Sequence, residues 1–127
     1  MDTSWSHTVE QMDTLRDIGL EYLDIIKVWS MLPGFEERFA LRGKTRLMAL
    51  CRFHNEKTPS LRIWPKSRRF MCHGCQETGD TLYLLKVFEK CCIDSEELRH
   101  LSPELRQEEV MFFKNILEKY LRRRIFL

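Results

Sequence analysis

The sequence predicts an α+β fold, in which a small antiparallel β-sheet is flanked by N- and C-terminal α-helices. Apolar residues recur at helical spacing near both ends of the chain, and short runs of alternating polarity lie between them. Cysteine and histidine residues bracket those runs in two pairs. The chain has 127 residues, of which 43% are hydrophobic and 31% charged, so it is long enough for one folded domain with a packed core.

The first part of the chain is predicted to be helical. From Val9 to Leu32 the apolar residues recur at the spacing of one helix face. We expect Gly19 to divide this stretch into two helices and Pro33-Gly34 to end the second. Residues 1–34 are therefore predicted to form an N-terminal helical segment.

The middle of the chain is predicted to form the strands. After a charged connector over residues 35–45, residues 46–50 are compatible with a short strand. Residues 60–64 alternate between apolar and polar side chains, as a half-buried strand does. A turn over residues 65–68 then leads into residues 69–71, which return as the second arm of a hairpin.

Helices are predicted again after the hairpin. Asp80 has the character of an N-cap for an apolar helix, and a short helix follows near residues 95–101. Ser102-Pro103 combines a capping hydroxyl with a proline in the first turn, which is typical of a helix start. We therefore predict a central domain over residues 35–101 and a C-terminal amphipathic helix over residues 102–127.

The charge of the chain is distributed unevenly. The formal net charge is only +2, but residues 42–69 carry nine basic side chains and one acidic one. Residues 1–41 have a net charge of −5 and residues 70–127 a net charge of −1. A basic block of this density is typical of a surface that binds a polyanion, although a solvated charged face gives the same pattern.

Two pairs of metal-binding residue types bracket the predicted hairpin. Two residues separate Cys51 from His54, two separate Cys72 from Cys75, and 17 residues lie between the pairs. This spacing lets both side chains of a pair reach one ion, and two pairs complete the tetrahedron that zinc prefers. We therefore predict a zinc ribbon with one structural Zn²⁺, since four protein ligands leave no position open for water or substrate.

The remaining cysteines and the chain termini carry weaker signals. The N-terminus lacks the features of a secretory signal, and no apolar run approaches the roughly 20 residues that span a bilayer. We therefore expect a cytoplasmic location, reduced thiols and no membrane contact. Cys91 and Cys92 are expected to pack as small apolar side chains. A thiol redox role for Cys72 and Cys75 is an alternative to zinc binding.

The metal-binding pairs belong to a longer pattern. It consists of Cys51-Arg52-Phe53-His54, Glu56-Lys57-Thr58-Pro59-Ser60, Phe70-Met71-Cys72-His73-Gly74-Cys75 and Gly79-Asp80. Over roughly residues 22–101 this pattern resembles the zinc-binding domain of bacterial DnaG-type replicative primases. Upstream, Asp24-Ile25-Ile26 resembles the start of a helix in that family, whereas Arg52 stands where the family usually has proline.

The resemblance implies a domain that binds single-stranded template DNA and helps to choose the priming site. Such primases continue into a TOPRIM catalytic domain, which the 127 residues do not include, so we expect no catalytic residues here. We expect the domain to support primer synthesis by a protein partner: a primase-polymerase, a helicase or a replication initiator, with a mobile element as one setting. An independent DNA-binding regulator is the alternative.

Candidate nucleic-acid contacts lie on and around the hairpin. Arg62 and Trp64 share the exposed face of one predicted strand and offer a cation beside a surface on which a base can stack. Basic side chains around them can meet phosphates. The whole set is Arg46, Lys57, Arg62, Trp64, Lys66, Arg68 and Arg69. The flanking helices are expected either to cover the small sheet or to bind the protein partner.

Overall fold

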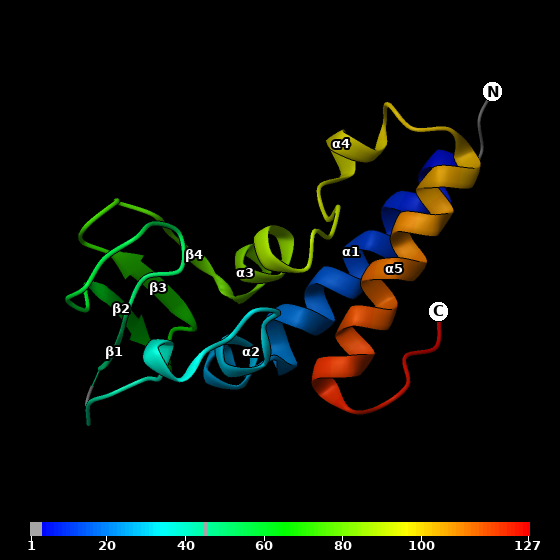
Figure 1. The fold of residues 1–127 in the computed structure, drawn as a ribbon. Coiled ribbons are helices and arrows are strands. Elements are labelled where there is room, and N and C mark those ends of the chain that lie inside the picture. The colour runs from blue at the N-terminus through cyan, green and yellow to red at the C-terminus, as the bar shows by residue number, and fades with distance from the viewer. Residues whose placement is uncertain (1–3, 45) are drawn as a thin grey trace.

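A four-stranded antiparallel sheet lies at one end of the molecule and two long helices lie side by side at the other (Figure 1). The computed structural model describes residues 4–44 and 46–127. The predicted α+β fold is confirmed. Its elements are α1 (Ser4–Tyr22), α2 (Ile25–Met31), the 3₁₀ helix η1 (Glu37–Phe39), β1 (Leu47–Ala49), β2 (Leu61–Trp64), β3 (Arg69–Cys72), β4 (Thr78–Asp80), α3 (Thr81–Phe88), α4 (Ser95–Leu98) and α5 (Pro103–Leu121).

The strands follow one another in the order β1-β2-β3-β4, and each pairs with the next in antiparallel fashion. Because side chains alternate along a strand, the sheet has one buried and one open face. Ala49, Leu61, Ile63, Phe70 and Cys72 are buried on the inner face. β4 was not expected from the sequence, since Thr78-Gly79-Asp80 shows no apolar alternation. It is defined by its pairing with β3.

The N-terminal helices differ from the prediction in where they break. Gly19 does not end a helix: α1 continues through it to Tyr22, and α2 begins after Asp24. The Asp24 carboxylate caps α2 by accepting a hydrogen bond of 2.9 Å from the amide of Ile26. Gly19 instead marks close packing, since a Cβ there would lie 2.7 Å from Cδ2 of Leu82 on α3.

The last helix, α5, packs along α1 (Figure 1). The hydroxyl of Ser102 accepts a hydrogen bond from the amide of Leu105, as the predicted cap requires. The apolar side chains of this amphipathic helix differ in burial: Phe113 is fully buried, whereas Leu105 and Phe112 are exposed. None of the described helices is both long and apolar enough to cross a membrane.

Aromatic rings connect the sheet to the helices through α3. Phe53, which lies between the first pair of predicted ligands, stacks on Phe70 of β3 with ring centroids 5.5 Å apart. It also packs against Phe88 of α3 at 5.1 Å, and Tyr83 of α3 lies 6.0 Å from both Phe53 and Phe70. Buried aromatic pairs of this kind contribute about 0.5–1.5 kcal/mol each beyond the area they bury. The sheet is thereby held against α3, which in turn packs on α1 and α2.

Two neighbouring phenylalanines of α5 allow a direct test of the helix packing. Phe113→Ala is expected to lower the free energy of unfolding by about 3–5 kcal/mol, because it leaves a cavity in the core. Phe112 has 42% of its surface exposed, so Phe112→Ala is expected to change it by less than about 0.5 kcal/mol. Urea unfolding followed by circular dichroism measures both. Equal effects of the two substitutions would contradict the described packing of α5.

Candidate metal centre and nucleic-acid interface

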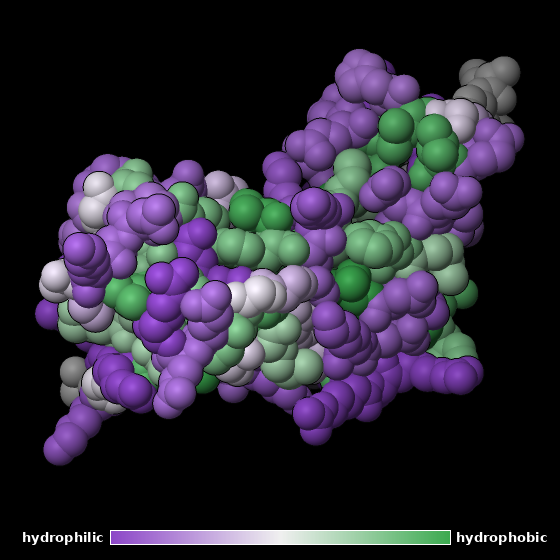
Figure 2. Space-filling model, in the orientation of Figure 1, coloured by the Kyte–Doolittle hydropathy of each residue, from purple (hydrophilic) through white to green (hydrophobic). Residues whose placement is uncertain are grey.

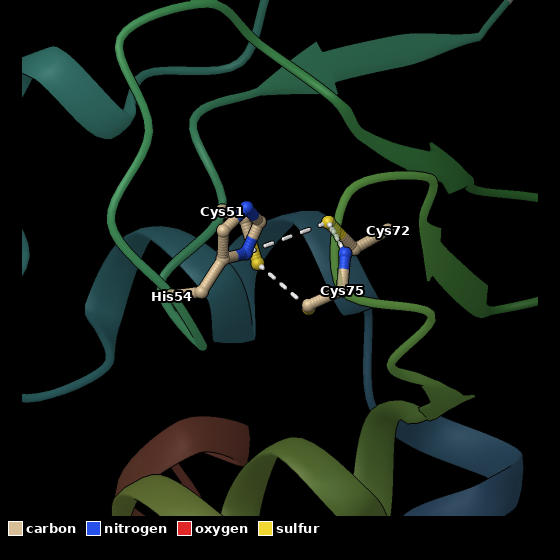
Figure 3. A group of neighbouring side chains, drawn as sticks. All are labelled: Cys51, His54, Cys72 and Cys75. Atoms are coloured by element: carbon tan, nitrogen blue, oxygen red, sulfur yellow. Dashed lines mark hydrogen bonds between the residues drawn. The ribbon is translucent and has the colours of Figure 1, made fainter.

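Cys51, His54, Cys72 and Cys75 converge at one end of the sheet (Figure 3). The first pair lies just after β1, while Cys72 is the last residue of β3 and Cys75 lies in the turn that leads to β4. Their sulfur and nitrogen ligand atoms all lie within 4.8 Å of one another. In Figure 3 the two pairs approach from different segments, and their side chains turn toward a common centre.

The separations between the ligand atoms suit a zinc ion. Zn–S bonds of about 2.3 Å in a tetrahedron place two sulfur atoms about 3.8 Å apart. The Sγ atoms of Cys51 and Cys75 are 3.8 Å apart, and Sγ of Cys72 lies 3.8 Å from Nδ1 of His54. Three thiols and one imidazole form a soft donor set that favours zinc over Mg²⁺ or Ca²⁺. A zinc ion held by all four would have a closed, structural coordination sphere.

The electrostatics of the thiols call for a cation between them. Burial raises the pKa of the Cys51 thiol to about 12, so its thiolate is costly unless a positive charge lies beside it. Burial acts in the same direction on Cys72, but hydrogen bonds from the Ser60 hydroxyl and from the amides of Cys75 and Gly74 outweigh it and lower the pKa of that thiol. The site thus already stabilises one thiolate.

The Glu56 carboxylate connects residues of the metal group through hydrogen bonds. One of its oxygens accepts hydrogen bonds from the amides of Cys51 and Ser60 at 2.8 and 3.0 Å, and the other accepts from the Ser60 hydroxyl. Partial burial opposes ionisation of Glu56, but these hydrogen bonds outweigh it and lower the pKa of the carboxyl group. Nε2 of His54 lies 3.2 Å from this carboxylate, which leaves Nδ1 on the side of the thiols.

Two further features shape the knuckles, the short turns that carry the ligand pairs. A Cβ on Gly74 would lie 2.7 Å from Nε2 of His54, so only glycine allows the second knuckle to approach the first this closely. In the first knuckle, the Arg52 guanidinium points away from the metal group, lies over the rings of Trp29 and Phe88 at 5.6 and 4.6 Å, and donates to the carbonyl of Pro33. Arg52 therefore anchors the knuckle to the helices.

The two remaining cysteines lie apart from the metal group, in the segment between α3 and α4. Cys91 is buried, and burial raises the pKa of its thiol to about 12. Cys92 is half-buried, and burial together with nearby carboxylates, Glu97 first among them, raises its thiol pKa to about 11. Both thiols therefore stay protonated at neutral pH, as expected for side chains that pack as small apolar groups.

The open face of the sheet gathers the candidate nucleic-acid contacts into two rows. In one row Trp64 of β2 pairs with Arg69 of β3, and Arg46, one residue before β1, falls on the same face by strand alternation. In the other row Arg62 lies between Met48 and Met71. Trp64 has 36% of its surface exposed, and Arg46 and Arg69 are exposed. We call the face formed by Arg46, Arg62, Trp64 and Arg69 the basic platform.

The other three candidates lie off the platform. Lys57 is exposed in the loop after His54, and Lys66 is exposed in the turn between β2 and β3. Arg68, in the same turn, donates a hydrogen bond to the carbonyl of Leu20 in the last turn of α1. It thereby satisfies a helix C-terminal carbonyl and holds the turn against α1, so part of its hydrogen-bonding capacity is used within the fold.

The family of the chain can now be stated. The sequence profile of the CHC2 zinc finger, the zinc ribbon of DnaG, matches residues 8–107. The chain belongs to the CHC2 zinc finger family. The expectation of one zinc ion is thus supported both by the family and by the donor set. The match begins inside α1, so the family extends further toward the N-terminus than residue 22, where the sequence pattern alone had placed its start.

Relatives of this CHC2 zinc finger are DNA primases. The chain is 46% identical to the DNA primase of Streptomyces coelicolor over 46 residues, which are 35% of this chain and 7% of that protein. It is 40% identical to the Myxococcus xanthus DNA primase over 58 residues, 45% of this chain and 9% of the relative. The matched segments thus span less than a tenth of the length of these two primases.

A solved structure shares the fold. It is the Aquifex aeolicus primase, containing the zinc binding and RNA polymerase domains. The superposition has a TM-score of 0.51 and 22% sequence identity, and covers 87% of this chain and 21% of the other. The zinc ribbon and most of its flanking helices therefore follow a known arrangement. Sequence reasoning missed the positions of Glu56 and Arg52 in this arrangement, although both lie within the pattern that indicated the family.

Glu56→Ala is expected to weaken zinc binding by about 10- to 100-fold, because it removes the acceptor that fixes Cys51, Ser60 and His54. Competition with a chromophoric chelator measures the affinity. The neighbouring Lys57→Ala is the control, since Lys57 is exposed and outside the hydrogen-bond network, and it is expected to bind zinc like the unmodified chain. Unchanged zinc affinity of Glu56→Ala would show that the carboxylate has no part in holding the metal group.

Proposed function

We propose that this chain binds single-stranded template DNA through the basic platform and supports primer synthesis by a catalytic domain or partner protein outside these residues. The observation that carries the proposal is the row in which Trp64 lies with arginines on both sides. An aromatic ring flanked by cations offers stacking to a base and charge to the phosphates next to it. Membership of the CHC2 zinc finger family and the primase relatives support the same role.

A single strand suits the platform better than a duplex. Stacking on Trp64 requires an unpaired base, and stacking is worth about 1–3 kcal/mol per base. The carboxylate nearest the arginine row, Asp80, pairs in register with Arg69 but is engaged as the N-cap of α3, where it accepts from the amide of Tyr83 at 3.0 Å. The charge that faces the strand is therefore positive.

The zinc site supports this surface indirectly. It fixes the end of β3, which carries Arg69, and the end of β1, which Arg46 directly precedes, and it takes no part in chemistry. With Cys72 and Cys75 placed as zinc ligands, neither thiol is free for the redox role considered from the sequence. A cytoplasmic location, where thiols stay reduced, suits such a site.

One aromatic ring and a few phosphate contacts give modest affinity, so the proposed module acts with a protein partner. Candidate partners are a primase-polymerase, a helicase or a replication initiator. The exposed apolar residues of α5, Leu105, Met111 and Phe112, are free to contact such a partner. An independent regulator would need no such surface, so the presence or absence of a protein partner distinguishes the two candidate functions.

Trp64→Ala is expected to weaken binding of a fluorescent single-stranded oligodeoxynucleotide by about 5- to 150-fold, the equivalent of one lost stacking contact. Fluorescence anisotropy measures the dissociation constant. Phe112→Ala removes an exposed aromatic ring far from the sheet and is the control, with unchanged binding expected. Equal affinities of the two variants would move the binding site away from the platform.

Salt dependence tests the phosphate contacts separately. Log affinity falls as log salt rises, and each lost phosphate contact on a single strand makes this slope less steep by about 0.7. Arg69→Gln is expected to make the slope less steep by that amount. Arg99 is an exposed arginine after α4, and Arg99→Gln is expected to leave the slope unchanged. The opposite ranking would remove Arg69 from the interface.

Primer synthesis is expected to require a second component. The 127-residue chain, loaded with zinc and supplied with template, nucleotides and Mg²⁺, is expected to make no dinucleotide. Primer formation by a cognate catalytic protein is expected to rise when the chain is added and to depend on Trp64. Metal-dependent primer synthesis by the chain alone would contradict the proposed division of labour.

A further inference from the structure

A second basic and aromatic site lies at the junction of α1, α2 and the end of α5. Tyr22, Lys27, Arg122 and Arg123 line a hollow of about 470 Å³ together with Asp24 and nearby apolar side chains. This volume falls within the range of about 300–1,000 Å³ that is typical of ligand sites. Figure 2 shows hydrophilic side chains gathered below the C-terminal end of α5.

The geometry of the chain end builds this site. Arg122 adopts a left-handed conformation as the C-cap of α5, and its amide donates to the carbonyl of Glu118 at 2.7 Å. This cap turns the chain, and the Arg123 guanidinium then lies 4.6 Å from the centroid of the Tyr22 ring. Tyr22 keeps 51% of its surface exposed, so the ring remains open to a ligand.

The charges that face the hollow favour an anion. Three cationic side chains line it, against one carboxylate, that of Asp24. Asp24 is engaged as the N-cap of α2 and accepts hydrogen bonds from two backbone amides. Glu21 lies next to Tyr22 in the sequence and is exposed, but it is not among the residues that line the hollow.

The hollow adjoins the surface that carries the platform. The turn between β2 and β3 holds Lys66 and Arg68, and Arg68 donates to the carbonyl of Leu20, two residues before Tyr22. The same last turn of α1 therefore contacts the hairpin on one side and contributes the aromatic ring of the hollow on the other. A strand that continues from the platform past Lys66 would have to cross this turn of α1 to reach the hollow.

We propose that the Tyr22–Arg123 hollow is a second contact for the same nucleic-acid strand, with a base against Tyr22 and phosphates against Lys27 and Arg123. The inference rests on the proposed function, because the strand reaches the hollow from the platform. The CHC2 zinc finger match ends at residue 107, so Arg122 and Arg123 lie outside the residues that match the family. The hollow thus combines Tyr22 and Lys27, which lie within the family match, with two arginines that lie beyond it.

The proposal predicts that the effect of a substitution depends on the length of the DNA. The probes are fluorescein-labelled oligodeoxythymidines of about 6 and about 24 nucleotides, chosen around the single-strand site sizes of about 4–16 nucleotides. Tyr22→Ala is expected to weaken binding of the long oligonucleotide at least about fivefold and to leave the short one unchanged. Tyr22→Phe keeps the ring and is expected to bind both like the unmodified chain.

A matched pair of arginines tests the phosphate contact. For the long oligonucleotide, Arg123→Gln is expected to make the slope of log affinity against log salt less steep by about 0.7. Arg124→Gln removes the same charge one residue later, but Arg124 lines a different hollow with Gln11 and Met111, so no change is expected. Equal effects of the two variants would reduce the site to general charge attraction and overturn the proposal.

The failure of this inference can be told from failure of the proposed function. If Trp64→Ala weakens both oligonucleotides while Tyr22→Ala and Arg123→Gln weaken neither, the platform binds DNA and the second contact is wrong. If the unmodified, zinc-loaded chain binds neither oligonucleotide, the proposed function fails and the second contact falls with it. Circular dichroism and zinc content of each variant verify that the fold is intact.

Discussion

The convergence of four metal-binding side chains is the constraint on which the rest of the structure depends. The strands are only three or four residues long, so few backbone hydrogen bonds hold the sheet together. Cys51 and Cys72 join the ends of β1 and β3, which are not neighbours in the sheet. A zinc ion shared by the two knuckles therefore fixes the sheet from its end, independently of the hydrogen bonds between its strands.

Two residues of the first knuckle connect the metal group to the helices. Phe53 carries one knuckle into the aromatic cluster with Phe70 and α3. Arg52, its neighbour in the same knuckle, reaches the rings of Trp29 and Phe88 instead. The two adjacent residues thus tie one turn to two helices, and the apolar face of the sheet is covered as a result. The opposite face stays free, and it is there that arginines flank Trp64.

Much of the fold was predictable because its signals are local. Capping side chains such as Asp80 and Ser102, the two-residue ligand spacing and the alternation in β2 each depend on a few neighbouring residues. The misses depend on tertiary contacts. Gly19 looked like a helix end, but a neighbouring helix packs against it. The hydrogen bond from Arg68 to a carbonyl 48 residues away is likewise a tertiary contact that no local pattern indicates.

The fold places the basic and acidic parts of the sequence on different surfaces. Three arginines of the basic block, Arg46, Arg62 and Arg69, lie on the open face of the sheet. Four acidic side chains of the N-terminal segment are exposed along α1: Glu10, Asp13, Asp17 and Glu21. A second cluster of cations at the end of α5 lies beside the last turn of α1, close to the hairpin.

The central claim is that three thiolates and one imidazole close a structural zinc site that organises the sheet. Zinc K-edge X-ray absorption of the purified chain tests it most directly. The account predicts one zinc per chain with three sulfur ligands at about 2.3 Å and one nitrogen at about 2.0 Å. A coordination sphere with fewer than three sulfurs, or with a water oxygen among the ligands, would contradict it.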